Sequence, residues 1–90
     1  MKIKKGFVLR DICGEKVVIA EGLENIDFSK MLNLNETAAF LWTECIKMGE
    51  IDENKLCDAL FTEYEGITRE QAINDIRNML AQWQELGLVE

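Results

Sequence analysis

The side chains that could do acid–base or metal chemistry are carboxylates, which cluster at two places in the chain. One cluster is Glu50, Asp52 and Glu53, the other is Glu63 and Glu65, and the chain contains no histidine. Histidine is a frequent general base and the commonest metal ligand, whereas acids near helix ends usually interact with the helix dipole or with solvent. We therefore expect these acids to be solvated. The sequence predicts that the protein is not an enzyme and has neither a metal site nor a cofactor.

Nucleophilic or redox chemistry would have to use the three cysteines, Cys13, Cys45 and Cys57. Their number is odd and no CxxC pair occurs, so they match neither a disulfide framework nor a zinc site. A reactive thiol, the alternative, lacks a neighbouring histidine that would lower its pKa. We expect each cysteine to be a small apolar residue in or beside the core, in a reducing compartment.

The formal net charge is −7, from seventeen acidic and ten basic residues. Nucleic acids bind proteins largely through Lys and Arg, and a negative field also opposes an anionic membrane surface. The charge therefore argues against nucleic acid and against a membrane as partners, and it favours a partner with a basic segment.

The basic start of the chain precedes an apolar run of only three residues, too short for a signal peptide. No stretch approaches the about 18 apolar residues of a membrane span, so we expect a protein of the cytoplasm. The length predicts one domain, residues 1–90.

The first third of the chain predicts strands. Phe7–Ile12 and Glu15–Ala20 are rich in β-branched residues, and Gly14 between them can take the positive φ of a tight hairpin turn. Residues 21–30 are expected to be a looser connector, and Met31–Leu34 a third, short strand. The apolar residues expected to hold this connector against the core are Leu23, Ile26 and Phe28.

Three helices are predicted at about 36–48, 53–65 and 69–86. The expected N-caps are Asn35, Asp52 and Thr68, and the expected stops are Gly49, Gly66 and Gly87. Apolar residues at three- and four-residue spacing give each helix one buried face. These faces are Ala38, Leu41, Trp42, Cys45 and Ile46 in the first helix, Leu56, Leu60, Phe61 and Tyr64 in the second, and Ala72, Ile73, Ile76, Met79, Leu80 and Trp83 in the third.

The order of elements predicts an α+β domain of winged-helix type, a three-stranded antiparallel sheet followed by a three-helix bundle. The last two helices resemble a helix-turn-helix pair, so a DNA-binding or regulatory module is one hypothesis. The charged residues that the third helix offers are Arg69, Arg77, Glu70, Asp75 and Glu85. A recognition helix normally carries several basic or amide side chains in a basic surround, so this helix fits DNA poorly.

Binding to a polypeptide is the hypothesis that remains. An edge strand presents unpaired amides and carbonyls, and an extended peptide can add to it. Met31–Leu34 carries no charge that would block such an addition; Leu32 and Leu34 are expected to face the core, and Met31 and Asn33 to face outward. A structural subunit that dimerises through the same edge is a third hypothesis.

Several motifs resemble the coenzyme PQQ synthesis protein D (PqqD) family, also called precursor-peptide recognition elements. They are Leu34-Asn35-Glu36-Thr37-Ala38-Ala39 followed by Trp42, the helix Ile51–Tyr64, and the closing Leu86-Gly87-Leu88-Val89-Glu90. The resemblance implies three strands followed by three helices and no catalysis. It also implies that the leader of a ribosomally made precursor peptide binds as an extra strand and is presented to a modifying enzyme, often a radical SAM protein.

By position, the resemblance places the leader beside the third strand and against the third helix. The residues so implied are Met31, Leu32, Asn33 and Leu34 on the strand, and Asp75, Ile76, Met79, Gln82 and Trp83 on the helix. For the helix side chains, core packing and plain solvent exposure are the competing interpretations. The resemblance leaves the pathway open between PQQ synthesis and a related peptide-modification system.

Overall fold

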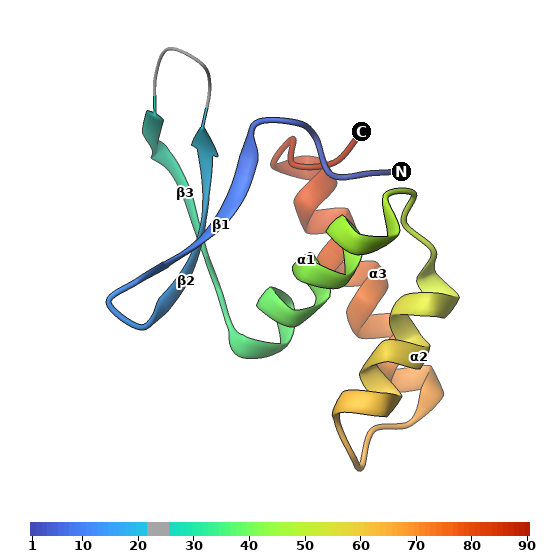
Figure 1. Ribbon diagram of the computed structural model, residues 1–90. Coiled ribbons are helices and arrows are strands. Elements are labelled where there is room, and N and C mark those ends of the chain that lie inside the picture. The colour runs from blue at the N-terminus through green and yellow to red at the C-terminus, as the bar shows by residue number, and fades with distance from the viewer. Residues whose placement is uncertain (22–25) are drawn as a thin grey trace.

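A computed structural model describes the backbone of residues 1–21 and 26–90 and the side chains of residues 1–20 and 32–90. The strands are β1 (Phe7–Ile12), β2 (Glu15–Glu21) and β3 (Ile26–Leu34), and the helices are α1 (Glu36–Met48), α2 (Glu53–Glu63) and α3 (Arg69–Glu85). The sheet stands beside the helices, and α1 follows β3 directly (Figure 1). The predicted fold class and order of elements are confirmed.

The three strands form one antiparallel sheet in the order β1-β2-β3. The hairpin between β1 and β2 closes with the pair Ile12↔Glu15, so its loop has only two residues. Both loop residues have positive φ, 54° at Cys13 and 85° at Gly14, as a type I′ turn requires. The predicted hairpin is confirmed, but Cys13 is exposed in its turn, whereas Cys45 and Cys57 are buried as predicted.

The strand β3 is longer than predicted. Instead of a connector up to residue 30, it pairs with β2 from Ile26 onward, through Glu21↔Ile26 and Ala20↔Asp27. An irregularity between Val18 and Ala20 shifts the register before the pairing resumes toward Leu34. Backbone pairing with β2 thus extends the strand through a segment in which Asp27 and Lys30 weaken the strand preference of Ile26 and Phe28. The expected contacts of Leu23, Ile26 and Phe28 lie outside the described side chains.

The predicted helix caps are present. The Asn35 side chain accepts a hydrogen bond from the Ala38 amide (2.8 Å), and Thr68 accepts one from the Gln71 amide (3.1 Å). The Asp52 side chain accepts from the amides at the start of α2. The helix α2 ends at Glu63, two residues before the predicted end, and α3 ends at Glu85.

The end of α3 is a Schellman motif. The Gly87 amide donates to the Gln84 carbonyl (3.1 Å) and the Leu88 amide to the Trp83 carbonyl (2.8 Å), with φ of 78° at Gly87. Leu88 folds back and is buried. The isolated bridge Ile3↔Val89 then joins the two ends of the chain.

The core centres on Trp42 of α1 and Trp83 of α3, whose rings meet edge to face with centroids 5.2 Å apart. Around them pack buried residues from the sheet and all three helices, among them Val18, Leu56 and Ile76.

Two predicted core residues are instead on the surface. Ile46 is 53% exposed and Phe61 is 37% exposed. Each lies next to a buried helix residue, Cys45 or Leu60, and the 100° turn per residue carries it off the contact face. Hydrophobic periodicity alone therefore predicted a wider buried face for α1 and α2 than the structure has.

Candidate functional site

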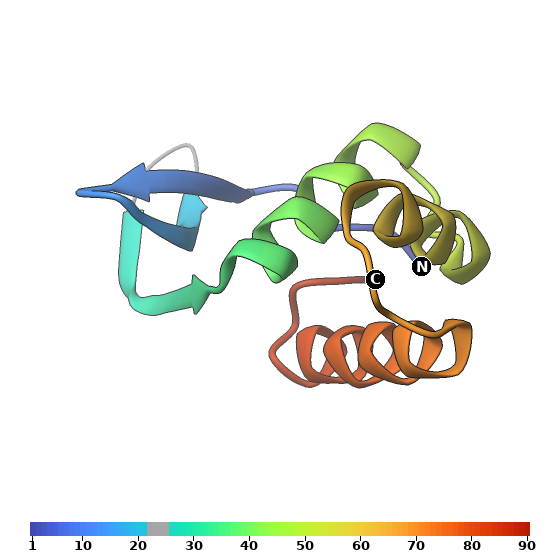
Figure 2. The ribbon, with the colours of Figure 1, turned by 90° about the horizontal axis from the view of Figure 1, so that it is seen from below.

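The candidate site starts at the outer edge of β3. This strand pairs with β2 on one side, and among the described residues no strand pairs with its other side. Figure 2 shows β3 and α3 on the same side of α1. The free edge therefore runs toward the space beside α3.

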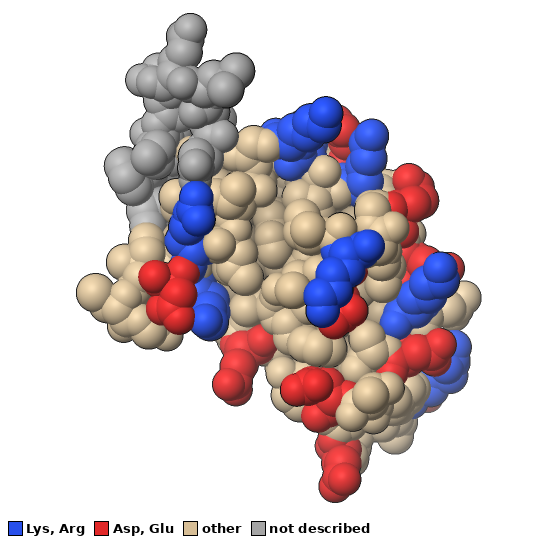
Figure 3. Space-filling view, in the orientation of Figure 1, with Lys and Arg blue, Asp and Glu red and all other residues tan. Residues whose placement is uncertain are grey.

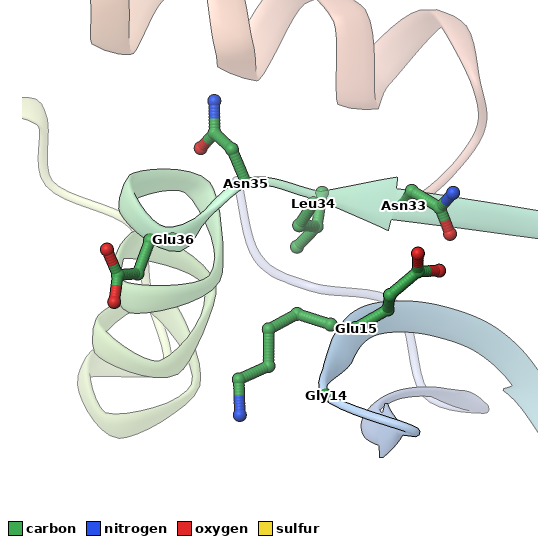
Figure 4. A pocket seen from close by; sticks show the side chains of 7 residues that line it. Gly14, Glu15, Asn33, Leu34, Asn35 and Glu36 are labelled. Atoms are coloured by element: carbon green, nitrogen blue, oxygen red, sulfur yellow. The ribbon is translucent and has the colours of Figure 1, made fainter.

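Side chains of β3 alternate as predicted over the described part of the strand. Leu32 and Leu34 are half-buried and pack against the core, whereas Asn33 is exposed. Figure 4 shows Asn33, Leu34 and Asn35 in line as the chain leaves β3, with Glu15 of β2 pointing toward Asn33. The backbone of β3 is thus accessible at the point where the strand meets α1.

A groove between α1 and α3 continues from this junction. Its lining residues are Asn35, Thr37, Ala38, Leu41, Asp75, Asn78, Met79 and Gln82. The floor is apolar, since Leu41 is buried and Ala38 and Met79 are half-buried. The exposed rim on α3 is polar, with Asp75 as the one charged residue that lines the groove among those described. We call this surface the inner groove.

The structure brings only some of the predicted helix residues to this groove. Asp75, Met79 and Gln82 line it, whereas Ile76 and Trp83 are in the core with 0% and 1% exposure. A ligand in the inner groove would contact the first three and would not reach the other two. Their burial instead holds α3 in place behind the groove.

Five lining residues were not among the predicted site residues, and one of them, Asn35, was predicted only as a helix cap. Asn78 shares one face of α3 with Asp75 and Gln82, and that three- to four-residue spacing is a signal present in the sequence. Thr37, Ala38 and Leu41 form the α1 wall, and only the crossing of α1 over α3 places them there.

The surroundings of Cys45 and Asp11 shift the pKa values of both side chains. Burial raises the pKa of the Cys45 thiol to about 12, so it remains protonated and unreactive. A hydrogen bond from Lys16 and its positive charge lower the pKa of Asp11 at the surface. No group of three potential metal ligands occurs in the described part of the chain.

The basic residues of α3 are already engaged by α2. The Arg77 Nε donates to Glu53 (3.1 Å), and Arg69 lies 3.8 Å from Asp58. These pairs direct the two guanidinium groups toward acids of the neighbouring helix. The helix that would read DNA in a winged-helix protein thus presents no free basic row in the described structure.

Comparison with known proteins decides the family. The sequence profile of coenzyme PQQ synthesis protein D (PqqD) matches residues 15–89, which is most of the chain. The chain belongs to the PqqD family. The matched part of this PqqD-family chain contains β2 and β3 and all three helices, and therefore both walls of the inner groove.

A solved structure shares the fold of this PqqD-family chain. It is TbiB1 in complex with the TbiA(beta) leader peptide, with 21% sequence identity and a TM-score of 0.78. The similarity covers 100% of this chain and 95% of that chain. No curated protein sequence matches. In the described residues, no helix is long and apolar enough to cross a membrane.

Proposed function

We propose that this chain is a non-catalytic peptide chaperone that binds the leader of a ribosomally made precursor peptide and presents it to a modifying enzyme. The observation that carries the proposal is the free edge of β3, which leads into the inner groove between α1 and α3. Membership of the PqqD family supports it, and so does the shared fold with TbiB1, whose structure contains a leader peptide.

Strand addition explains how such a chain binds. The nine residues of β3 offer about 30 Å of edge. Within Met31, Leu32, Asn33 and Leu34, every second residue turns its amide and carbonyl away from β2, and a leader would take its main-chain hydrogen bonds from these, so its affinity would depend weakly on its sequence. Every second side chain of the added strand would face α3, where the apolar floor and Met79 would receive aliphatic groups.

The site residues of this proposal differ in their roles. The backbone of β3 supplies the edge, and Asp75, Met79 and Gln82 supply side-chain contacts from α3. Ile76 and Trp83 are buried and support the helix from within. No residue has a catalytic role and no cofactor is needed.

The proposed partners are the leader and a modifying enzyme, for which a radical SAM protein is our first expectation, in the cytoplasm. The pathway is PQQ synthesis or a related peptide-modification system. Nothing observed favours the DNA-binding alternative, because Arg69 and Arg77 of α3 are paired with acids. A homodimer through the edge of β3 would compete with the leader, and sedimentation with and without peptide would detect it.

Isothermal titration with the precursor peptide encoded beside this gene tests the proposal. We expect a Kd near 1 μM, about −8 kcal/mol. The variant Asn33→Pro removes one strand amide and should weaken binding about tenfold, whereas the matched control Asn33→Ala, which keeps the amide, should bind as the parent does. Circular dichroism must show that both variants fold.

Two results would contradict this function. One is the absence of binding to every small peptide encoded near the gene. The other is unchanged affinity in a folded Asn33→Pro protein, together with unchanged affinity when Met79→Glu puts a charge into the groove floor.

A further inference from the structure

The helix α1 separates the inner groove from a second groove on its other side. This outer groove runs between α1, the sheet and the end of α2. The α1 residues that line it include Glu36, Phe40 and Lys47, on a stripe separate from Thr37, Ala38 and Leu41 of the inner groove. A ligand in one groove therefore leaves the other free.

The centre of the outer groove is apolar. Leu9 of β1, Phe40 of α1 and Tyr64 after α2 meet there, each half-buried. The rings of Phe40 and Tyr64 meet edge to face, with their centroids 5.9 Å apart. This contact holds two aromatic surfaces in place at the opening of the outer groove. Figure 3, seen from this side, shows a largely uncharged surface between α1 and the neighbouring sheet, with a basic and an acidic side chain over α1 itself and further acidic side chains along the lower border.

The charges of the outer groove are unbalanced. Its two lysines are neutralised by acids of the chain itself, Lys16 by Asp11 at 2.8 Å and Lys47 by Glu44 at 3.6 Å. Glu36 and Glu63 also line the groove, and neither forms an ion pair with any described residue. Two acids that form no ion pair within the described part of the chain, at the rim of an apolar centre, favour a ligand that is both apolar and cationic.

We propose that the outer groove docks a segment of the modifying enzyme in which Lys or Arg alternates with apolar residues. The partner's identity rests on the function proposed above, whereas the chemistry of the segment follows from the groove. A second copy of this chain fits poorly, because it also carries a charge of −7 and would bring more acids to the acidic rim. The leader would occupy the inner groove, on the other side of α1.

Two synthetic peptides of twelve residues test the chemistry. One alternates Lys with Leu, and the control alternates Glu with Leu. Titrated into 15N-labelled protein, the basic peptide should shift the amide resonances of Phe40, Thr43 and Tyr64, and its affinity should fall as salt rises from about 0.05 to 0.3 M. Equal affinity for the two peptides, or shifts centred on Asp75 and Met79, would overturn the proposal.

Matched variants distinguish binding in the outer groove from general attraction by the net charge of the protein. Glu36→Lys and Glu70→Lys each reverse an acid in the first turn of a helix, but only Glu36 lines the outer groove. We expect Glu36→Lys, combined with Glu63→Lys, to weaken the basic peptide about tenfold or more, and the control with the same change in charge, Glu70→Lys combined with Glu85→Lys outside the groove, to weaken it less than threefold. Equal losses in the two proteins would show general charge attraction and reject the site.

The enzyme encoded beside the gene completes the test. The Glu63→Lys protein, whose substitution lies in the outer groove and away from the pocket of Figure 4, should bind this enzyme about fivefold more weakly while its Kd for the leader stays within twofold. Unchanged affinity for the enzyme would refute this docking site and leave leader binding intact. Loss of leader binding by the parent protein would instead refute the proposed function, so the two failures are distinguishable.

Discussion

Replacement of Trp83 by Phe should lower stability without weakening leader binding. The resemblance to PqqD proteins placed Trp83 in the peptide site, but the side chain is 1% exposed and meets Trp42 at 5.2 Å inside the core. Truncation of a buried Trp to Ala costs about 3–5 kcal/mol, and an aromatic pair adds about 0.5–1.5 kcal/mol. A domain of 90 residues has only about 5–13 kcal/mol in total, so Phe is the safer replacement.

The smaller ring of Phe keeps an aromatic contact with Trp42 and leaves a smaller cavity. We therefore expect a loss of about 1–2 kcal/mol in the free energy of unfolding. Each kcal/mol lowers the Tm of a domain of this size by about 4–8 °C. Urea and thermal unfolding followed by circular dichroism measure the loss, and titration with the leader well below the Tm measures binding, which should stay within twofold of the parent.

Met79→Ala is the matched control, because Met79 is half-buried on the same helix and lines the inner groove. It should weaken leader binding about five- to tenfold, by loss of apolar contact worth about 1 kcal/mol, with a smaller loss of stability than Trp83→Phe. The reverse pattern, a leader affinity that falls more than tenfold in Trp83→Phe and not in Met79→Ala, would refute the assignment of Trp83 to the core.

Three further predictions concern local features. Gly87→Ala should cost about 1 kcal/mol in urea unfolding, because φ is 78° there, while the nearest atom to an added Cβ, Lys4 Nζ, is 3.9 Å away and causes no clash. In native protein a thiol reagent should modify the exposed Cys13 quickly at pH 8 and leave Cys45, whose pKa is about 12, unmodified until the chain unfolds. Lys16 lowers the pKa of Asp11, so the stability that this ion pair adds is present above the unfolded pKa of about 4 and is lost as pH falls through the lower folded pKa. Asp11→Asn should therefore reduce the Tm slightly at pH 7 and have no effect near pH 2. Equal effects at both pH values would contradict this.

The sequence by itself determined the features that depend on a few neighbouring residues. The Asn35 cap, the Gly14 turn and the Schellman motif at Gly87 were all predictable, because a side-chain acceptor three residues from an amide, or a positive φ, is a local matter. The order of three strands and three helices follows from the same signals and from hydrophobic periodicity.

Only the tertiary structure decided which surfaces these elements share. The extension of β3 back to Ile26 depends on pairing with β2 beyond a register shift, and the α1 wall of the inner groove depends on how α1 crosses α3. For the same reason Trp83 and Met79, which look alike in the apolar pattern, separate into a core residue and a groove residue. Periodicity reports that a residue lies on an apolar face, whereas contact between elements distant in the chain determines whether that face is closed by the core or left open for a ligand.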